Sequence, residues 1–409
     1  MVQKMRKMKD SGIEWIGEIP EGWEVVPVKR LCTMQAGKNL TSEQIAPEGT
    51  YPVYGGNGIR GFFSDYNCDG QFLTVGRQGA LCGNVHKISG KVWATEHAVI
   101  TTPSSYTILD FLYFLLIGMD LNQYVSSTAA QPGLAVGTLL NLKTCYPCST
   151  LEQTQISNYL NAKCSEIDVM LSKTRSSIEE YKKLKQAVIT QAVTKGVRGE
   201  REMKDSGVEW IGEIPKEWDI LNLVAHTSML TPMRDRPENL DGPIPWIRIE
   251  DFDGKYISSS KASLGVFKET VRSMNLKIYP VGTILCTSSC IMGKCAIVSR
   301  ELVSNQRFIG IIPDQNTCEN FLYYLMLSNS ERMNYLATGA LQANLSRSSF
   351  EHLKVQFPSY QEQKEISDYL DTKCAEIDKL IAKKEQLVKE LESYKKSLIY
   401  EVVTGKREV

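Results

Sequence analysis

Two segments of the chain carry apolar residues at spacings of three, four and seven, which places those residues on one face of a helix. Charged and polar residues fill the other positions, and neither segment contains glycine or proline until its end. The pattern predicts long helices at 152–200 and 362–409 that pack against each other as a coiled coil. The predicted seam residues are Ile156, Leu160, Ile167, Leu171, Ile178, Ile366, Leu370, Ile377, Ile381 and Val388.

The chain contains an internal sequence repeat. Residues 8–23 read MKDSGIEWIGEIPEGW and residues 203–218 read MKDSGVEWIGEIPKEW, with 13 of 16 positions identical. Residues 152–168, EQTQISNYLNAKCSEID, return at 362–378 as EQKEISDYLDTKCAEID, with 11 of 17 identical. The offset rises from 195 to 210 between the two motifs, so fifteen extra residues are expected in the front part of the second variable region.

Divergent stretches at 24–151 and 219–361 separate the repeated motifs, and each is the size of a domain. Both are punctuated by glycine and proline as β-rich segments are, and FLYFLL and FLYYLM predict one buried helix in each. We therefore expect an α+β fold with a pseudo-twofold internal repeat, in which two similar β-rich globular domains are separated by two long helices. The predicted boundaries are 1–151 and 201–361 for the domains, each with its Trp motif, and 152–200 and 362–409 for the helices.

Charge and composition limit the possible functions. Lys+Arg and Asp+Glu are both 47 among 409 residues, and basic and acidic residues number 8 and 8 in 24–151 and 14 and 13 in 219–361. Composition alone thus favours an ordinary solvated surface, and a nucleic-acid reader would depend on local clusters. The candidate clusters are Arg60, Arg77, Lys87 and Lys91, and Arg234, Arg236, Arg248, Lys294 and Arg307. The absence of a signal peptide or a bilayer-length apolar run predicts a cytoplasmic protein with no membrane partner.

Motifs for catalysis or cofactor binding are weak. Gly56, Gly58 and Gly61 fit a dinucleotide pattern, but no helix start follows them, so a glycine-rich loop in a β domain is expected. Cys145 and Cys148 have redox spacing without a thioredoxin-like setting, and we expect the eleven cysteines to be thiols packed in or near the core. No phosphate-binding loop, zinc-protease or nucleophile-elbow motif occurs, so neither a catalytic residue nor a metal site is predicted, and His97 beside Glu96 is interpreted as structural.

The repeated MKDSG-Ile/Val-EWIGEIP motif resembles the one that opens each half of the DNA specificity subunit of type I restriction–modification enzymes. The two EQ-x-x-IS-x-YL-x-x-KC-x-EID segments are similar to the conserved helices of that family, as are AVTKG at 192–196 and VVTGK at 402–406. Framework phrases within the variable domains also match, among them YPVYGGNGIRG, GRQGALCGNV, PWIRIEDFDG and QANLSRSSFEHLKV. The resemblance covers essentially the whole chain.

That resemblance implies two target recognition domains separated by antiparallel helices, with each domain reading one half of a bipartite DNA site. It implies that the helices set the spacer and dock two methyltransferase (modification) subunits, and that motor–nuclease (restriction) subunits join the complex. The partners implied are therefore double-stranded DNA and these subunits. The chain itself is then non-catalytic and without cofactors, because S-adenosylmethionine, ATP and Mg²⁺ belong to the partner subunits.

Polar residues of matching loops are the candidates for base contact, because arginine and amide side chains make bidentate bonds to guanine and adenine. They are Asn57, Arg60, Arg77, Gln78, Asn84, His86, Ser288, Ser289, Lys294, Asn305, Gln306 and Arg307. For each of them, a turn residue that satisfies backbone groups is an equal alternative. Two other classes of protein stay open: a scaffold that binds proteins through its coiled coil and no DNA, and an enzyme with a cryptic cysteine or metal site.

Overall fold

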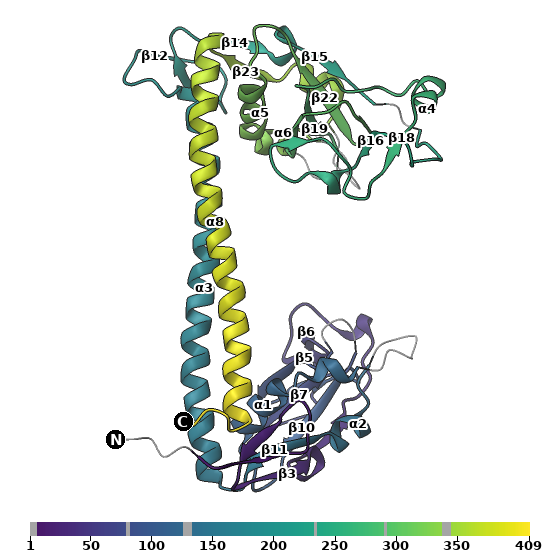
Figure 1. Ribbon diagram of the computed structural model, residues 1–409, viewed down its shortest axis with the longest axis vertical. Coiled ribbons are helices and arrows are strands. Elements are labelled where there is room, and N and C mark those ends of the chain that lie inside the picture. The colour runs from purple at the N-terminus through teal and green to yellow at the C-terminus, as the bar shows by residue number, and fades with distance from the viewer. Residues whose placement is uncertain (1–5, 79–81, 126–132, 233–234, 290–292, 338–344) are drawn as a thin grey trace. The chain divides into compact units, whose positions relative to one another are not determined.

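The computed structural model describes residues 6–78, 82–125, 133–232, 235–289, 293–337 and 345–409. It divides into two compact units, which we call unit 1 (Met1–Arg175 with Glu385–Val409) and unit 2 (Ser176–Lys384). Each unit consists of a globular domain and part of each of the two long helices α3 and α8 (Figure 1).

The domain of unit 1 is built on two sheets. One is antiparallel, with strand order β4-β10-β7-β8, and the other has the order β6-β5-β9, in which β5 is antiparallel to β6 and parallel to β9. Strand β7 lies inside its sheet and is buried over five consecutive residues, which explains its nearly unbroken apolar sequence. The strands are β1 Met8–Asp10, β2 Glu18–Pro20, β3 Trp23–Pro27, β4 Cys32–Ala36, β5 Tyr51–Gly55, β6 Gly58–Phe63, β7 Gln71–Gly76, β8 Val85–Ser89, β9 Trp93–Ala94, β10 Ala98–Pro103 and β11 Lys143–Pro147, and the short helices are α1 Leu109–Gly118 and α2 Val136–Asn141.

Unit 2 repeats this topology. Its sheets have the orders β15-β22-β19-β20-β17 and β18-β16-β21, and β16 is again parallel to β21. The strands are β12 Met203–Asp205, β13 Glu213–Pro215, β14 Asp219–Asn222, β15 Thr227–Leu230, β16 Ile244–Ile247, β17 Tyr256–Ile257, β18 Gly265–Val266, β19 Ile284–Thr287, β20 Cys295–Val298, β21 Val303–Ser304, β22 Phe308–Pro313 and β23 Lys354–Phe357, and the short helices are α4 Lys268–Ser273, α5 Glu319–Ser328, α6 Ser330–Leu336 and α7 Arg347–Glu351. The apolar segments FLYFLL and FLYYLM lie in α1 and α5, whose inner faces are fully buried, as the sequence predicts.

The extra residues of the second copy lie in the front part of its domain, as the change of offset predicts. Fifteen residues separate β5 from β7, whereas 36 separate the equivalent strands β16 and β19. The longer segment carries α4 and the edge strand β17, which pairs in parallel with β20. The insertion therefore widens the main sheet of unit 2 by one strand.

The long helices are α3, Thr150–Lys195, and α8, Tyr360–Val403. In unit 1, Asp168 pairs with Lys395 and Arg175 with Glu392, so the chains of α3 and α8 run in opposite directions there. In unit 2 the Lys185–Asp378 ion pair and the stacking of Lys384 on Tyr181 show the same orientation. The antiparallel helices that the family resemblance implies are thus confirmed within each unit.

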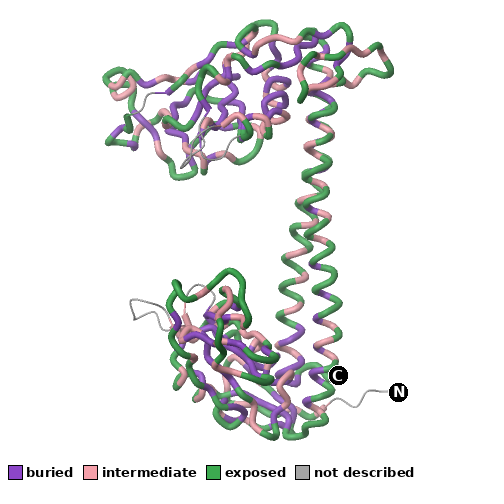
Figure 2. Tube along the Cα trace, turned by 180° about the vertical axis from the view of Figure 1, so that it is seen from behind, coloured by how far each residue is buried: buried purple, intermediate pink, exposed green. Residues whose placement is uncertain are grey.

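Each hydrophobic core is shared by a domain and the helices. In unit 1, Trp23 and Phe111 share a core with Leu160 of α3 and Val403 of α8. In Figure 2 buried residues gather inside each domain, while the long helices are largely exposed or half-buried. Ile156, Leu160, Ile167, Leu171, Ile178, Ile366, Leu370 and Ile377 are buried, and Ile381 and Val388 are half-buried. The apolar stripes therefore pack on the domains as well as helix on helix.

The end of α8 lies against the first Trp motif. The hydroxyl group of Tyr400 donates a hydrogen bond of 2.8 Å to the carbonyl of Trp15, and Gly405 lies against the ring of Pro20. Pro20 is in turn paired with Met8, which places the C-terminal residues near the first strand of the chain. Within the described parts of the chain, none of the helices has the length and apolar character needed to cross a membrane.

Candidate nucleic-acid interface

Parallel strand pairing brings two polar segments of unit 2 to one sheet edge. Strands β16 and β21 pair at Trp246–Val303 and Ile247–Ser304. Because the carboxyl ends of parallel strands meet at the same edge, Arg248 and the segment 305–307 leave the sheet side by side. Both sequences are polar where the strands before them are apolar, which marks the edge as a surface for polar contacts.

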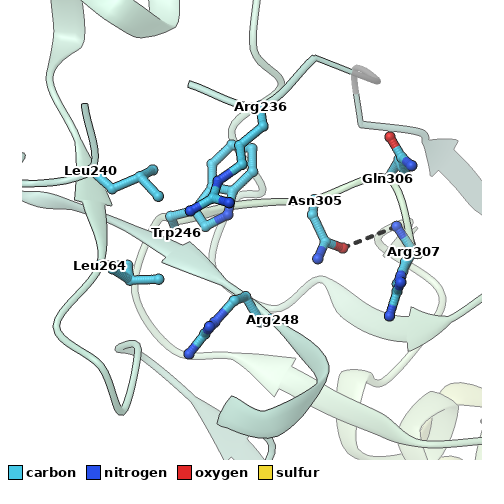
Figure 3. A pocket seen from close by; sticks show the side chains of 8 residues that line it. All are labelled: Arg236, Leu240, Trp246, Arg248, Leu264, Asn305, Gln306 and Arg307. Carbon is cyan, nitrogen blue, oxygen red and sulfur yellow. Dashed lines mark hydrogen bonds between the residues drawn. The ribbon is translucent and has the colours of Figure 1, made fainter. Parts of the chain in front are cut away.

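A hollow of about 260 Å³ lies at this edge, and we call it the arginine hollow. Arg236, Arg248 and Arg307, from three different segments of the chain, are among the residues that line it (Figure 3). Its apolar lining comes from Leu240, Trp246 and Leu264, and its remaining polar residues are Asn305 and Gln306. Side chains with several N–H donors thus surround a small space with an apolar wall.

The hydrogen bonds around the hollow fix its backbone, and of its three arginines only Arg248 has a carboxylate within 4 Å among the described residues. The Oδ1 atom of Asn305 accepts the backbone N–H of Arg307 at 3.0 Å, and the carbonyl of Arg307 accepts the N–H of Ser288 at 2.8 Å. The Nε atom of Arg248 is buried without a hydrogen bond, and the nearest carboxylate oxygen, of Glu250, is 3.9 Å away. The hollow is therefore a donor-rich, positively charged site.

Unit 1 has the same edge with different side chains. Strands β5 and β9 are parallel, so the turn after Gly55 and the segment after Ala94 leave together. The N–H of Arg77 donates to the carbonyl of His97 at 2.9 Å, as that of Ser288 does to Arg307 in unit 2. His97 of unit 1 therefore occupies the position of Arg307 in unit 2.

The edge of unit 1 carries neutral groups, an acid and Arg60, which packs over Gly55. The side-chain amide of Asn84 donates to Oδ1 of Asn57 at 2.8 Å, and a Cβ atom placed on Gly58 would lie 3.6 Å from the ring of His86. Partial burial lowers the pKa of His86 below its ordinary value, so this imidazole is neutral at pH 7. The Nε2 atom of His97 lies 3.2 Å from Glu96. The two units thus present different chemistry on one framework.

Comparison with known proteins decides the family. The model described as "Type I restriction modification DNA specificity domain" matches residues 20–180 and 219–390, which together are most of the chain. The chain belongs to this family. The two matched regions each cover one domain with the adjoining part of its long helix.

Relatives in this specificity-domain family match over different lengths. The type I restriction enzyme EcoprrI specificity subunit of Escherichia coli is 44% identical over 121 residues, 29% of this chain and 30% of that protein. The MjaIX specificity subunit of Methanocaldococcus jannaschii is 34% identical over 181 residues, 42% of this chain and 41% of that protein. The chain thus covers less than half the length of these two relatives. A putative MjaX specificity subunit of the same organism is 24% identical over 422 residues, with 96% and 95% covered.

Two solved structures show the fold of the family. One, described as the structural basis of complex assembly and conformational transition of the type I R-M system, has a TM-score of 0.72 at 12% identity and covers 95% of this chain and 99% of its own. The HsdS subunit from Thermoanaerobacter tengcongensis has a TM-score of 0.50 at 12% identity and covers 97% and 100%. Similarity at this level of identity concerns the fold alone.

The other residues predicted to contact bases differ in their surroundings. The Nε atom of Arg77 donates to the carbonyl of Leu134 at 3.2 Å, so this side chain supports a loop. Ser289 is buried, whereas Lys294 is exposed. The remaining candidates lie close to the parallel-strand edges: Arg60 packs over Gly55, the backbone of Gln78 lies beside Gly56, and Ser288 is bonded to Arg307.

Two residues of the arginine hollow are predicted from the sequence only as members of a basic cluster. Arg236 and Arg248 line the hollow but are absent from the predicted base-contacting set. The signal that could have identified Arg248 is its place directly after the apolar segment PWI. Arg234, from the same cluster, lies outside the described residues.

The remaining motifs have structural roles. The glycine pattern at 56–61 forms the β5–β6 hairpin, and no helix follows it, so the nucleotide-binding context is absent.

Of the ten described cysteines, all free, eight are buried, including Cys145, Cys164 and Cys374. The prediction of packed thiols is wrong for Cys148, which is exposed. Cys290 lies outside the described residues. No group of three or more potential metal ligands occurs among the residues that the structure describes.

Proposed function

We propose that this chain is the DNA sequence-specificity subunit of a type I restriction–modification complex and that each unit reads one half of a bipartite site in double-stranded DNA. The observation that carries the proposal is the repeated strand edge, at which His97 in unit 1 corresponds to Arg307 in unit 2. Unequal half-sites require different base contacts on similar frameworks. Two related domains suit two half-sites that lie about one helical turn of DNA apart, or multiples of it.

The long helices are proposed to set the spacer and to dock two methyltransferase subunits. Both carry apolar side chains outside their cores: Met170 of unit 1 is 52% exposed and its counterpart Leu380 of unit 2 is 41% exposed. Tyr394 and its counterpart Leu184 are 49% and 48% exposed. A charged surface helix has few reasons to expose such residues unless an apolar partner face covers them. Because the exposed positions recur in both units, the same partner is expected twice.

The chemistry of modification and cleavage is assigned to the partner subunits. In this proposal S-adenosylmethionine binds the methyltransferase, and ATP and Mg²⁺ bind the motor–nuclease subunits. Each recognition domain has nearly equal numbers of basic and acidic residues, so the domains attract the DNA backbone only weakly. We therefore assign most phosphate contacts to the methyltransferase subunits.

The proposal is tested by mapping methylated adenines in cells that express the methyltransferase subunits with and without this chain. A bipartite motif that appears only with the chain supports it. Methylation independent of the chain, or no DNA retardation by the assembled subunits, would instead indicate a protein scaffold.

The docking role is tested with Met170→Asp and Leu380→Asp, which should abolish co-purification of the methyltransferase. Lys383→Asp, at an exposed polar position of α8, is the matched control and should retain it.

A further inference from the structure

We infer that the arginine hollow of unit 2 reads guanine in the major groove, with Arg248 and Arg307 as the residues that contact the base. The inference rests on the proposed function and names the base that one half-site must contain. Guanine presents two adjacent acceptors, N7 and O6, in the major groove, and the planar fork of one arginine bonds to both. Each of these two side chains offers such a fork at the rim of the same small hollow.

The two assigned arginines of the hollow favour guanine over adenine. Bidentate recognition of adenine needs an amide that donates to N7 and accepts from the N6 amino group. The side-chain oxygen of Asn305 already accepts the backbone N–H of Arg307, so only one of its two lone pairs is left, and Gln306 is the other amide of the hollow. The side chains of Arg248 and Arg307 have donors alone. A base edge with two acceptors satisfies this set better than one with an amino group.

The two assigned arginines are held by their backbones. Arg248 directly follows β16, and its N–H donates to Oδ2 of the buried Asp251 at 2.7 Å. Arg307 directly precedes β22, and its own N–H and carbonyl are both hydrogen-bonded. Side chains on such rigid supports lose less entropy when they bind than those on loops. Arg236 lies in the longer loop between β15 and β16 and is exposed, so we assign it a phosphate contact.

The guanine contact assigned to Arg248 and Arg307 belongs to unit 2. In unit 1 the position of Arg307 is taken by His97, which pairs with Glu96. A carboxylate at that edge repels the acceptors of guanine, and the nearby Asn57–Asn84 pair is uncharged. Changes to the arginine hollow should therefore alter one half-site and leave the other unchanged.

The experiment uses the full chain assembled with its methyltransferase subunits and a library of duplexes randomised in both half-sites. For wild type, one half-site should contain a required guanine. Arg248→Ala or Arg307→Ala should lower the discrimination at one guanine by about 5- to 150-fold, which is the ~1–3 kcal/mol of a bidentate contact. Arg248→Lys and Arg307→Lys, which keep the charge but lose the fork, should relax the same position. Arg236→Ala should weaken methylation of all sequences alike, and Lys216→Ala, an exposed charge of the same unit, is the control.

A second readout tests direct contact. Replacing the critical guanine by 7-deazaguanine removes N7, so it should weaken methylation by wild type and leave the relaxed arginine variant unaffected. Overturning results are a half-site of unit 2 without guanine, arginine variants that keep their full base preference, or a deaza effect that is the same in wild type and variants. Absence of any sequence preference in wild type would contradict the proposed function itself, and is thereby distinguished from failure of this inference. Equal thermal midpoints of the variants show that folding is intact, and the lysine variants serve where an alanine variant is unstable.

Discussion

The ammonium group of Lys87 lies 2.8 Å from Oδ1 of Asp110 and donates to Oδ1 of Asn161 at 3.2 Å. These three residues belong to β8, α1 and α3, so one cation joins the recognition sheet of unit 1 to its long helix. In unit 2 the equivalent site has Asn320 on α5 and Asp371 on α8, with the acid and the amide exchanged. The cation there is Lys255, which pairs with Asp371.

The exchange predicts the outcome of a swap in unit 1. Asp110→Asn should lower the free energy of unfolding by about 1 kcal/mol, because Lys87 loses a carboxylate that is about one-third exposed. Adding Asn161→Asp should restore most of the loss, since it reproduces the arrangement of unit 2. Denaturant unfolding monitored on unit 1 measures both effects. Asp69→Asn, which removes an exposed acid of the same unit, should cost much less, and a double variant less stable than Asp110→Asn would contradict the interpretation.

The same ion pair has a predictable pH dependence. Burial raises the pKa of Asp110, but hydrogen bonds from Lys87 and Asn161 outweigh it and hold that pKa below its ordinary value of 3.8. A lowered pKa in the folded state gives stability that is present above pH 3.8 and is lost as the pH falls through the folded-state value. The cost of Asp110→Asn should therefore shrink as the pH is lowered below about 3.8.

The sequence predicts the internal repeat, but it predicts only part of the ion-pair site around Lys87. A shift of 210 residues relates Asp110 to Asn320 and Asn161 to Asp371, so those counterparts are readable from the alignment of the halves. The same shift relates Lys87 to Ile297, which is apolar and buried. The replacement cation comes from the inserted segment of unit 2. A repeat offset cannot show where an insertion places a side chain, because that depends on long-range packing of β17 against β20.

The arginine hollow could not be predicted from the sequence for a related reason. Arg248 and Asn305 are 57 residues apart and meet because β16 and β21 are parallel. Apolar runs of two to four residues give no indication of which strands pair or in which direction. The long helices, in contrast, depend on local spacing that is visible in the sequence. The predicted ranges 152–200 and 362–409 therefore overlap closely with Thr150–Lys195 and Tyr360–Val403.

A second matched pair of sites links each Trp motif to its helix. The indole N–H of Trp218 donates to Glu362 at 3.0 Å, and Arg201 pairs with the same carboxylate at 2.6 Å. Trp23 donates to Glu152 at 3.0 Å in unit 1. The carboxylate side chain is 5% exposed in unit 2 and 26% exposed in unit 1. The carboxylate pairs with Arg6 in unit 1 and with Arg201 and Arg198 in unit 2, so the units differ in its burial and in the number of its arginine partners.

We therefore expect Glu362→Gln to be the more damaging of two identical changes. Glutamine keeps an acceptor for the indole but leaves the arginine charge uncompensated. In unit 2 this should cost about 3 kcal/mol, as for other broken buried pairs, and Glu152→Gln should cost about 1 kcal/mol because water screens the more exposed site. The midpoints of denaturant unfolding measure both. Equal losses in the two units would show that burial does not control the effect.

Thiol alkylation separates the exposed cysteine from the packed ones. Burial and the negative charge of Glu24 raise the pKa of the Cys148 thiol above its ordinary value of 9.0. Its labelling rate should therefore still be rising at pH 9, since the thiolate is the reactive form. Burial raises the pKa of Cys145 to about 12, so that thiol should stay unlabelled in the folded protein. Peptide mass spectrometry after iodoacetamide treatment at several pH values is the measurement, and Cys148→Ser is the control.

The proposal that the helices set the spacer predicts the effect of lengthening them together. Arg175 of α3 pairs with Glu392 of α8, so seven residues inserted after Arg175 and seven before Glu392 keep that pair and extend both helices at the same level. Seven residues are about two turns, or ~10 Å, which preserve the heptad phase and correspond to roughly three base pairs at ~3.4 Å each. The methylated motif should keep both half-sites and gain about three base pairs of spacer. Insertion of four residues rotates the apolar stripe and should instead lower stability. A methylome with altered bases and an unchanged spacer would mean that the helices do not determine the distance between the half-sites.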